Sequence, residues 1–144
     1  MSDNAFAETV GAICERDSRY DADAYYFIRD ALDYATKSLK KPRQGKGRHI
    51  TATELLDSIR AFALHEFGPM AHTVLKTWGV KRTEDVGDIV FNLVDAGALG
   101  KTEDDKREDF ANGFDFDEAF RRPYLPEASL PLADASPMDT RGGI

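Results

Sequence analysis

The sequence predicts a mainly helical domain of the α+β class, and three observations support this prediction. Apolar residues recur every three or four positions in several segments, which is the spacing of one face of an α-helix. Glycine and proline residues end several of these segments, as they do at the ends of helices. The chain has 144 residues, 42% of them hydrophobic, which suffices for one modest core but not for two ordinary domains. We therefore expect a single domain over residues 1–122.

Two helices are expected at the N-terminal end, over residues 1–39. The first covers about residues 5–15, and Asp3 or Asn4 caps its start. The second begins after Asp21 and runs to the end of this region, because apolar residues recur at spacings of three and four. A second apolar stripe widens its inward face, so we expect neighbouring elements to cover this helix on two sides. Its main stripe consists of Tyr25, Ile28, Leu32, Ala35 and Leu39.

Residues 40–49 are expected to form an exposed basic loop. They include Pro42, Gly45 and Gly47 and contain no apolar residue, so the segment has nothing to bury. Six basic residues and no acid occur between positions 37 and 48. Cations on such a loop suit a phosphate-rich surface such as RNA or the ribosome. The six candidate phosphate-binding residues are Lys37, Lys40, Lys41, Arg43, Lys46 and Arg48.

Residues 50–122 are expected to form the rest of the domain, beginning with two helices. Thr51, with Glu54 three positions later, forms a capping box, in which each side chain accepts a hydrogen bond from the other residue's backbone N–H. Gly68 and Pro69 end this helix. Pro69 also suits the first turn of a short second helix, because a proline there loses no intrahelical hydrogen bond. The pattern predicts two helices joined by a tight turn.

A third helix is expected from Thr83, which caps it, to Gly97, which ends it. The apolar spacing then changes. Residues 98–102 and 110–116 predict the two strands of a small β-ribbon, joined by a tip of acidic and basic residues. Further on, four prolines and few large apolar residues predict a disordered tail over residues 123–144.

From Thr51 to about Phe116, this order of elements resembles a winged helix-turn-helix domain. The segment GVKRTEDVGDIVFNLVDAGALGK carries the likeness. In that fold a turn after a glycine leads into a third helix capped by threonine, and a Gly-x-Leu such as 97–99 turns the chain into the wing. The resemblance implies a winged-helix-like three-helix core with a small β-ribbon wing. We expect the two N-terminal helices to pack on this core.

The whole chain is also similar to an uncharacterised bacterial protein family of about this length. This similarity implies one folded unit and no particular activity. The segments that carry it are Arg19-Tyr20, Phe67-Gly68-Pro69-Met70 and Phe116-Asp117-Glu118-Ala119-Phe120.

The charge of the third helix argues against sequence-specific DNA binding. DNA affinity requires several basic residues that neutralise phosphates. From position 81 to position 110, however, the chain has nine acids and five bases. The outer face of the helix carries acids and an asparagine but no lysine or arginine. Its members are Glu84, Asp85, Asp88, Asn92 and Asp95.

We expect instead a non-catalytic interaction or regulatory module that binds an unidentified protein partner with this acidic surface. The hypothesis assigns partner binding to Glu84, Asp85, Asp88 and Asp95. A solvated helix face explains the same acids equally well. The alternative function is an RNA- or ribosome-associated factor that uses the basic loop over residues 37–48.

Other kinds of site find little support in the residue pattern. His65, Glu66 and His72 do not match the HExxH pattern of zinc proteases, and Gly68-Pro69 interrupts the helix that would align the two imidazoles. Neither a Ser-His-acid arrangement nor a Cys-His pair is indicated. We therefore expect no metal, no cofactor and no enzymatic activity.

The chain is expected to be cytoplasmic and not to contact a membrane. No apolar run approaches the roughly 18 residues of a membrane-spanning helix, and the first residues, MSDNAFAETV, lack the pattern of a secretion signal. A single cysteine allows no internal disulfide, which fits a reducing compartment.

Overall fold

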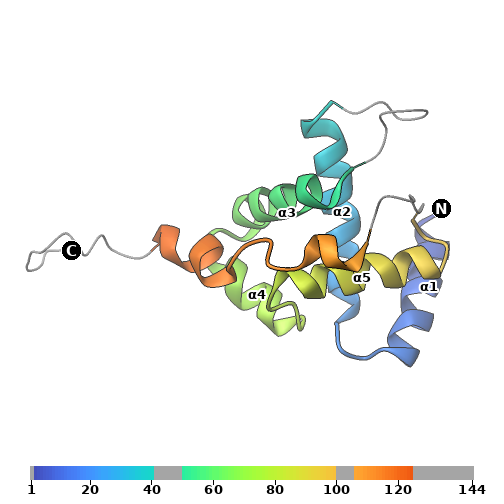
Figure 1. Ribbon diagram of the computed structural model, residues 1–144. Coiled ribbons are helices and arrows are strands. Elements are labelled where there is room, and N and C mark those ends of the chain that lie inside the picture. Colours follow the sequence, from blue (N-terminus) through green and yellow to red (C-terminus); the bar gives the residue numbers. More distant parts are fainter. Residues whose placement is uncertain (1, 41–49, 100–105, 125–144) are drawn as a thin grey trace, which may run out of the picture.

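A computed structural model describes residues 2–40, 50–99 and 106–124 of this chain. In these residues the chain forms five α-helices and four short helical turns (Figure 1). The α-helices are α1 (Asp3–Arg16), α2 (Ala22–Ser38), α3 (Ala52–Phe67), α4 (Ala71–Thr77) and α5 (Thr83–Asp95). The short turns are η1 (Gly68–Met70), η2 (Arg107–Phe110), η3 (Asp117–Arg121) and η4 (Arg122–Tyr124).

Two of the predicted helix starts are confirmed in detail. Asp21 caps α2, because its side chain accepts a hydrogen bond from the N–H of Asp23 at 2.9 Å. Thr51 and Glu54 form the predicted capping box of α3, with bonds of 3.0 and 3.1 Å. The start of α1 differs slightly, since Ser2 and not Asp3 or Asn4 provides the cap.

The predicted helix ends at two glycines are also confirmed. Gly79 follows α4 with a φ of 89°, and Gly97 follows α5 with a φ of 81°. Both angles lie in the left-handed region that glycine adopts without steric cost. At each end a backbone N–H just beyond the glycine bonds back to the helix, from Val80 to Leu75 and from Ala98 to Leu93.

The predicted β-ribbon is wrong, because the described residues contain no strand. Where the second strand was expected, the chain forms η2 and then irregular backbone, while residues 100–105 lie outside the described part. The reason is packing. Phe110 is buried against Gly87 of α5, where a Cβ would lie only 2.9 Å from the Cβ of Phe110. The aromatic residues bury themselves against helices, so the described fold is α-helical and has no wing.

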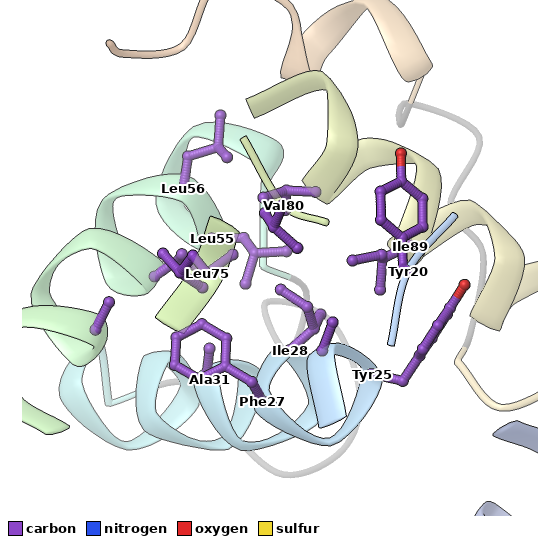
Figure 2. Packing of buried hydrophobic residues seen from close by; sticks show 14 of the residues in the cluster. Tyr20, Tyr25, Phe27, Ile28, Ala31, Leu55, Leu56, Leu75, Val80 and Ile89 are labelled. Carbon is purple, nitrogen blue, oxygen red and sulfur yellow. The ribbon is translucent and has the colours of Figure 1, made fainter. Parts of the chain in front are cut away.

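The core surrounds α2, as the width of its apolar face predicted. Helix α3 crosses α2 and packs against it, and α1 and α5 contact it from other directions (Figure 1). In Figure 2, Phe27 and Ile28 of α2 point toward Leu55 of α3 and Leu75 of α4. Phe27 also meets three aromatic rings at centroid distances of 5.4 to 5.7 Å, those of Phe62, Phe67 and Trp78.

The remaining segments complete this core. Phe116 and Phe120 belong to the same buried cluster as the helices, and their rings meet edge to face at 5.1 Å.

The predicted tail lies outside the described part from residue 125 onward. None of the described helices is both long and apolar enough to cross a membrane.

Candidate interaction face on helix α5

Helix α5 is the element to which the sequence assigns partner binding, and it is packed on two sides. Its inward residues Val86, Ile89 and Leu93 are fully buried. The segment containing η2 lies along another side, held by Phe110 against Gly87 and by a hydrogen bond from the N–H of Gly113 to the hydroxyl of Thr83 at 2.9 Å (Figure 1). The prediction that Thr83 caps α5 is wrong, because Thr83 is the first residue of the helix, Arg82 occupies the cap position and no side chain makes a capping bond there.

The turn between α1 and α2 contacts the acidic residues of α5. The hydroxyl of Tyr20 lies 2.8 Å from a carboxylate oxygen of Asp85 and 2.8 Å from one of Asp88. Because a hydroxyl has one proton, it donates to only one of the two carboxylates at a time. Burial, and then the hydrogen bonds to the two carboxylates, raise the pKa of Tyr20 well above its ordinary value.

Asp88 joins three parts of the chain. Besides Tyr20, it binds Arg19 at 3.2 Å and Arg107 of η2 at 2.7 Å. The guanidinium of Arg107 also stacks over the ring of Phe91, 5.2 Å from its centroid. The Asp88 side chain is only 23% exposed, so its carboxylate is largely shielded from solvent. Asp88 therefore ties the α1–α2 turn and η2 to α5.

The four predicted partner-binding acids separate into two kinds. Asp85 resembles Asp88 in being used internally, because it accepts the N–H of Lys81 at 2.9 Å as well as contacting Tyr20. Glu84 is half-buried and Asp95 is exposed, and neither forms an ion pair within the described residues. Asp85 and Asp88 thus bind other parts of the fold, whereas Glu84 and Asp95 form no ion pair with any described residue.

A second group of bonds continues from Arg19. Its guanidinium donates two hydrogen bonds to Asp17, at 2.9 and 2.7 Å, and the amide of Asn92 donates to Asp17 at 3.0 Å and to the hydroxyl of Tyr25 at 3.1 Å. The bond from Arg19 is the main cause that holds the pKa of Asp17 well below its ordinary value of 3.8.

Replacing Asp17 with asparagine should remove a pH-dependent part of the stability. Because the pKa of Asp17 is lower in the folded chain than in the unfolded chain, its carboxylate stabilises the fold fully above pH 3.8, and this contribution is lost as the pH falls through the folded-state pKa. The free energy of unfolding of the natural chain should exceed that of Asp17→Asn by a constant amount near neutral pH. This difference should shrink below about pH 4. Urea denaturation from about pH 7 to about pH 3 measures it.

The matched control for this experiment is Asp57→Asn, which removes an exposed carboxylate of α3 that has no ion pair within the described residues. If the advantage over Asp17→Asn stays constant down to about pH 3, the bond with Arg19 does not contribute to stability as proposed.

The basic residues predicted as a phosphate site are only partly described. Lys37 forms an ion pair with Asp33 at 2.9 Å. Lys40 is exposed at the end of α2 with a φ of 54°. The remaining four, Lys41, Arg43, Lys46 and Arg48, lie outside the described residues, so RNA binding by this loop stays a prediction.

The two histidines considered as metal ligands lie on different helices. His65 is exposed on α3, and its Nδ1 lies 3.2 Å from a carboxylate oxygen of its neighbour Glu66, while His72 lies on α4. In the described part of the chain, no group of three or more metal-ligating side chains is close enough to hold an ion.

Sequence reasoning missed Arg19, Tyr20 and Arg107, which partner the acids of α5. No local pattern indicates these pairs, because Arg19 and Tyr20 lie more than 60 positions before Asp85 and Asp88. Comparison of the chain with protein-family models, with curated proteins and with solved structures found no match.

Proposed function

We propose that this protein is a non-catalytic interaction or regulatory module that binds a protein partner with an acidic face formed by α5 and η2. The acidic face consists of Glu84 and Asp95 on α5 and Glu108 on η2. One observation carries the proposal: these three carboxylates have no ion pair within the described residues, whereas Asp88 on the same helix binds both Arg19 and Arg107.

The local charge balance supports this assignment. Helix α5 carries four carboxylates and no basic residue, and η2 adds two carboxylates and one arginine. The basic side chains that reach α5, Arg19 and Arg107, are both engaged by Asp88. The acidic face therefore keeps its negative charge, which attracts a partner with exposed lysine or arginine residues and accelerates their encounter.

The bonds around Asp88 support the proposal in a second way, because they hold the acidic face rigid. Helix α5 is fixed by its buried stripe, and η2 is fixed to α5 by Arg107 and by Phe110. A surface that is already ordered loses little conformational entropy when it binds. Asp85 and Asp88 thus serve binding indirectly, by holding the elements that carry the acidic face.

Charge reversal on the acidic face should abolish partner capture. In the variant Asp95→Lys with Glu108→Lys, two free carboxylates become cations that repel a basic partner surface. Both positions are exposed, so the fold should be retained. The measurement is affinity capture of the tagged full chain from its native extract at low and moderate salt, with and without RNase, followed by identification of the retained proteins.

The matched control is Glu15→Lys with Asp57→Lys, which changes the net charge equally at exposed positions of α1 and α3. The control should retain the partners of the natural chain. The proposal fails if the acidic-face variant retains the same RNase-resistant partners. Recovery of ribosomal or other RNA that disappears with RNase would instead support the basic loop over residues 37–48 as the functional surface.

A further inference from the structure

A cavity lies beside α4, on other elements than those that carry the acidic face. Its volume is about 610 Å³, which falls in the range of small-molecule sites. The lining side chains come from η1, from one side of α4 and from η3, and none of them is a carboxylate. They are Pro69, His72, Thr73, Lys76, Thr77 and Arg121.

Helical spacing places the polar groups of α4 in two adjacent rows. His72 and Lys76 are four positions apart, as are Thr73 and Thr77, so each pair projects from the same side of the helix. The hydroxyl of Thr77 donates a hydrogen bond to the carbonyl oxygen of Thr73 at 2.8 Å. The lone pairs of this hydroxyl can still accept a hydrogen bond from a ligand. Neither His72 nor Lys76 forms an ion pair within the described residues.

Arg121 faces these rows from η3, which packs against α4. Asp117, one turn earlier on η3, binds its guanidinium at 2.6 Å and so holds the side chain in place. An arginine has five N–H donors, so this contact leaves others for a ligand. The cavity thus combines an ammonium group, a guanidinium, an imidazole and hydroxyls on opposing walls.

We propose that this cavity binds a small phosphate-bearing molecule. Lysine provides a point charge, arginine a planar set of donors, and threonine a neutral hydroxyl, which together match the several oxygens of a phosphate group. The whole chain has a net charge of −7, whereas the side chains that line this concave surface include two cations and no carboxylate; Asp117 pairs with Arg121, and Lys76 has no ion pair within the described residues. The proposal is independent of the acidic face, which has the opposite charge and lies on other elements.

Inorganic pyrophosphate added to the isotopically labelled full chain should shift the backbone NMR signals of residues 72–77 and 121. The variant Lys76→Gln with Arg121→Gln should weaken this binding at least tenfold, since it removes two charged hydrogen-bond donors. Both side chains are exposed, so the fold should survive, and the unchanged signals of buried residues will verify this. Titration at constant ionic strength measures the affinity.

The matched control is Arg16→Gln with Lys81→Gln, which removes the same charge at exposed positions that do not line the cavity. The control should bind pyrophosphate as tightly as the natural chain. The proposal is overturned if pyrophosphate leaves the signals of residues 72–77 and 121 unchanged in the natural chain. It is also overturned if both double variants weaken binding equally, because then only the overall charge matters.

Discussion

Replacing Gly79 with alanine should lower the free energy of unfolding by about 3 kcal/mol. The φ of Gly79 is 89°, and a Cβ at this position would lie 2.3 Å from the carbonyl oxygen of Arg19. The left-handed backbone itself costs an L-residue about 1–2 kcal/mol. The carbonyl belongs to the backbone and cannot rotate away, so the α1–α2 turn must move as well.

That movement would reach the acidic side of α5. The N–H of Asp21 bonds to the carbonyl of Trp78 at 3.0 Å, directly beside Gly79, and each such bond contributes about 0.5–1.5 kcal/mol. Arg19 and Tyr20 lie in the same turn and hold Asp88. Urea denaturation followed by circular dichroism measures the loss of stability.

Gly97 provides the matched control for this prediction. Its φ is 81°, but a Cβ there would meet nothing within 4 Å. Gly97→Ala should therefore lower the free energy of unfolding only by the cost of the left-handed backbone, about 1–2 kcal/mol. Equal losses in the two variants would show that the close approach to Arg19 does not contribute.

Replacing Phe120 with alanine should lower the free energy of unfolding by about 3–5 kcal/mol. The Phe120 side chain is fully buried, and its ring packs edge to face on Phe114 at 5.8 Å and on Phe116 at 5.1 Å. Its removal leaves a cavity whose lining loses dispersion contacts in addition to the lost hydrophobic transfer energy. Urea denaturation of the natural and variant chains gives the difference.

The control for Phe120 is Tyr124→Ala. Tyr124 lies close by in η4 but is 46% exposed, so its removal should cost less than about 1 kcal/mol. If Phe120→Ala costs as little as Tyr124→Ala, then η3 does not unfold together with the helical core. A large loss would confirm that this aromatic segment is an integral part of the core.

The helices could be predicted from the sequence because their signals are local. A helix face repeats every three to four residues, and a cap or a left-handed exit involves neighbours within one turn. The Thr51–Glu54 capping box, the cap at Asp21 and the exits at Gly79 and Gly97 are all confirmed. The wide apolar face of α2 also indicated correctly that several elements would cover it.

The candidate sites could not be predicted to the same extent, because both depend on contacts between distant segments. From the sequence alone, Asp85 and Asp88 are expected to be surface acids available to a partner, like Asp95. The tertiary structure brings Tyr20 to both of them. The cavity beside α4 likewise requires Arg121, which lies more than 40 positions beyond the helix that it faces.

The sequence by itself determined where α2 and α3 begin, where α4 and α5 end and that α2 has a wide apolar face, since spacing and capping act within a few residues. Only the tertiary structure decided the form of residues 106–116 and which acids of α5 pair with other described residues. Phe110 packs into the space left by Gly87 instead of pairing as a strand, and Asp88 is occupied by Arg19 and Arg107. These contacts depend on the shape and charge of segments that are distant in the sequence, so no local pattern predicts them.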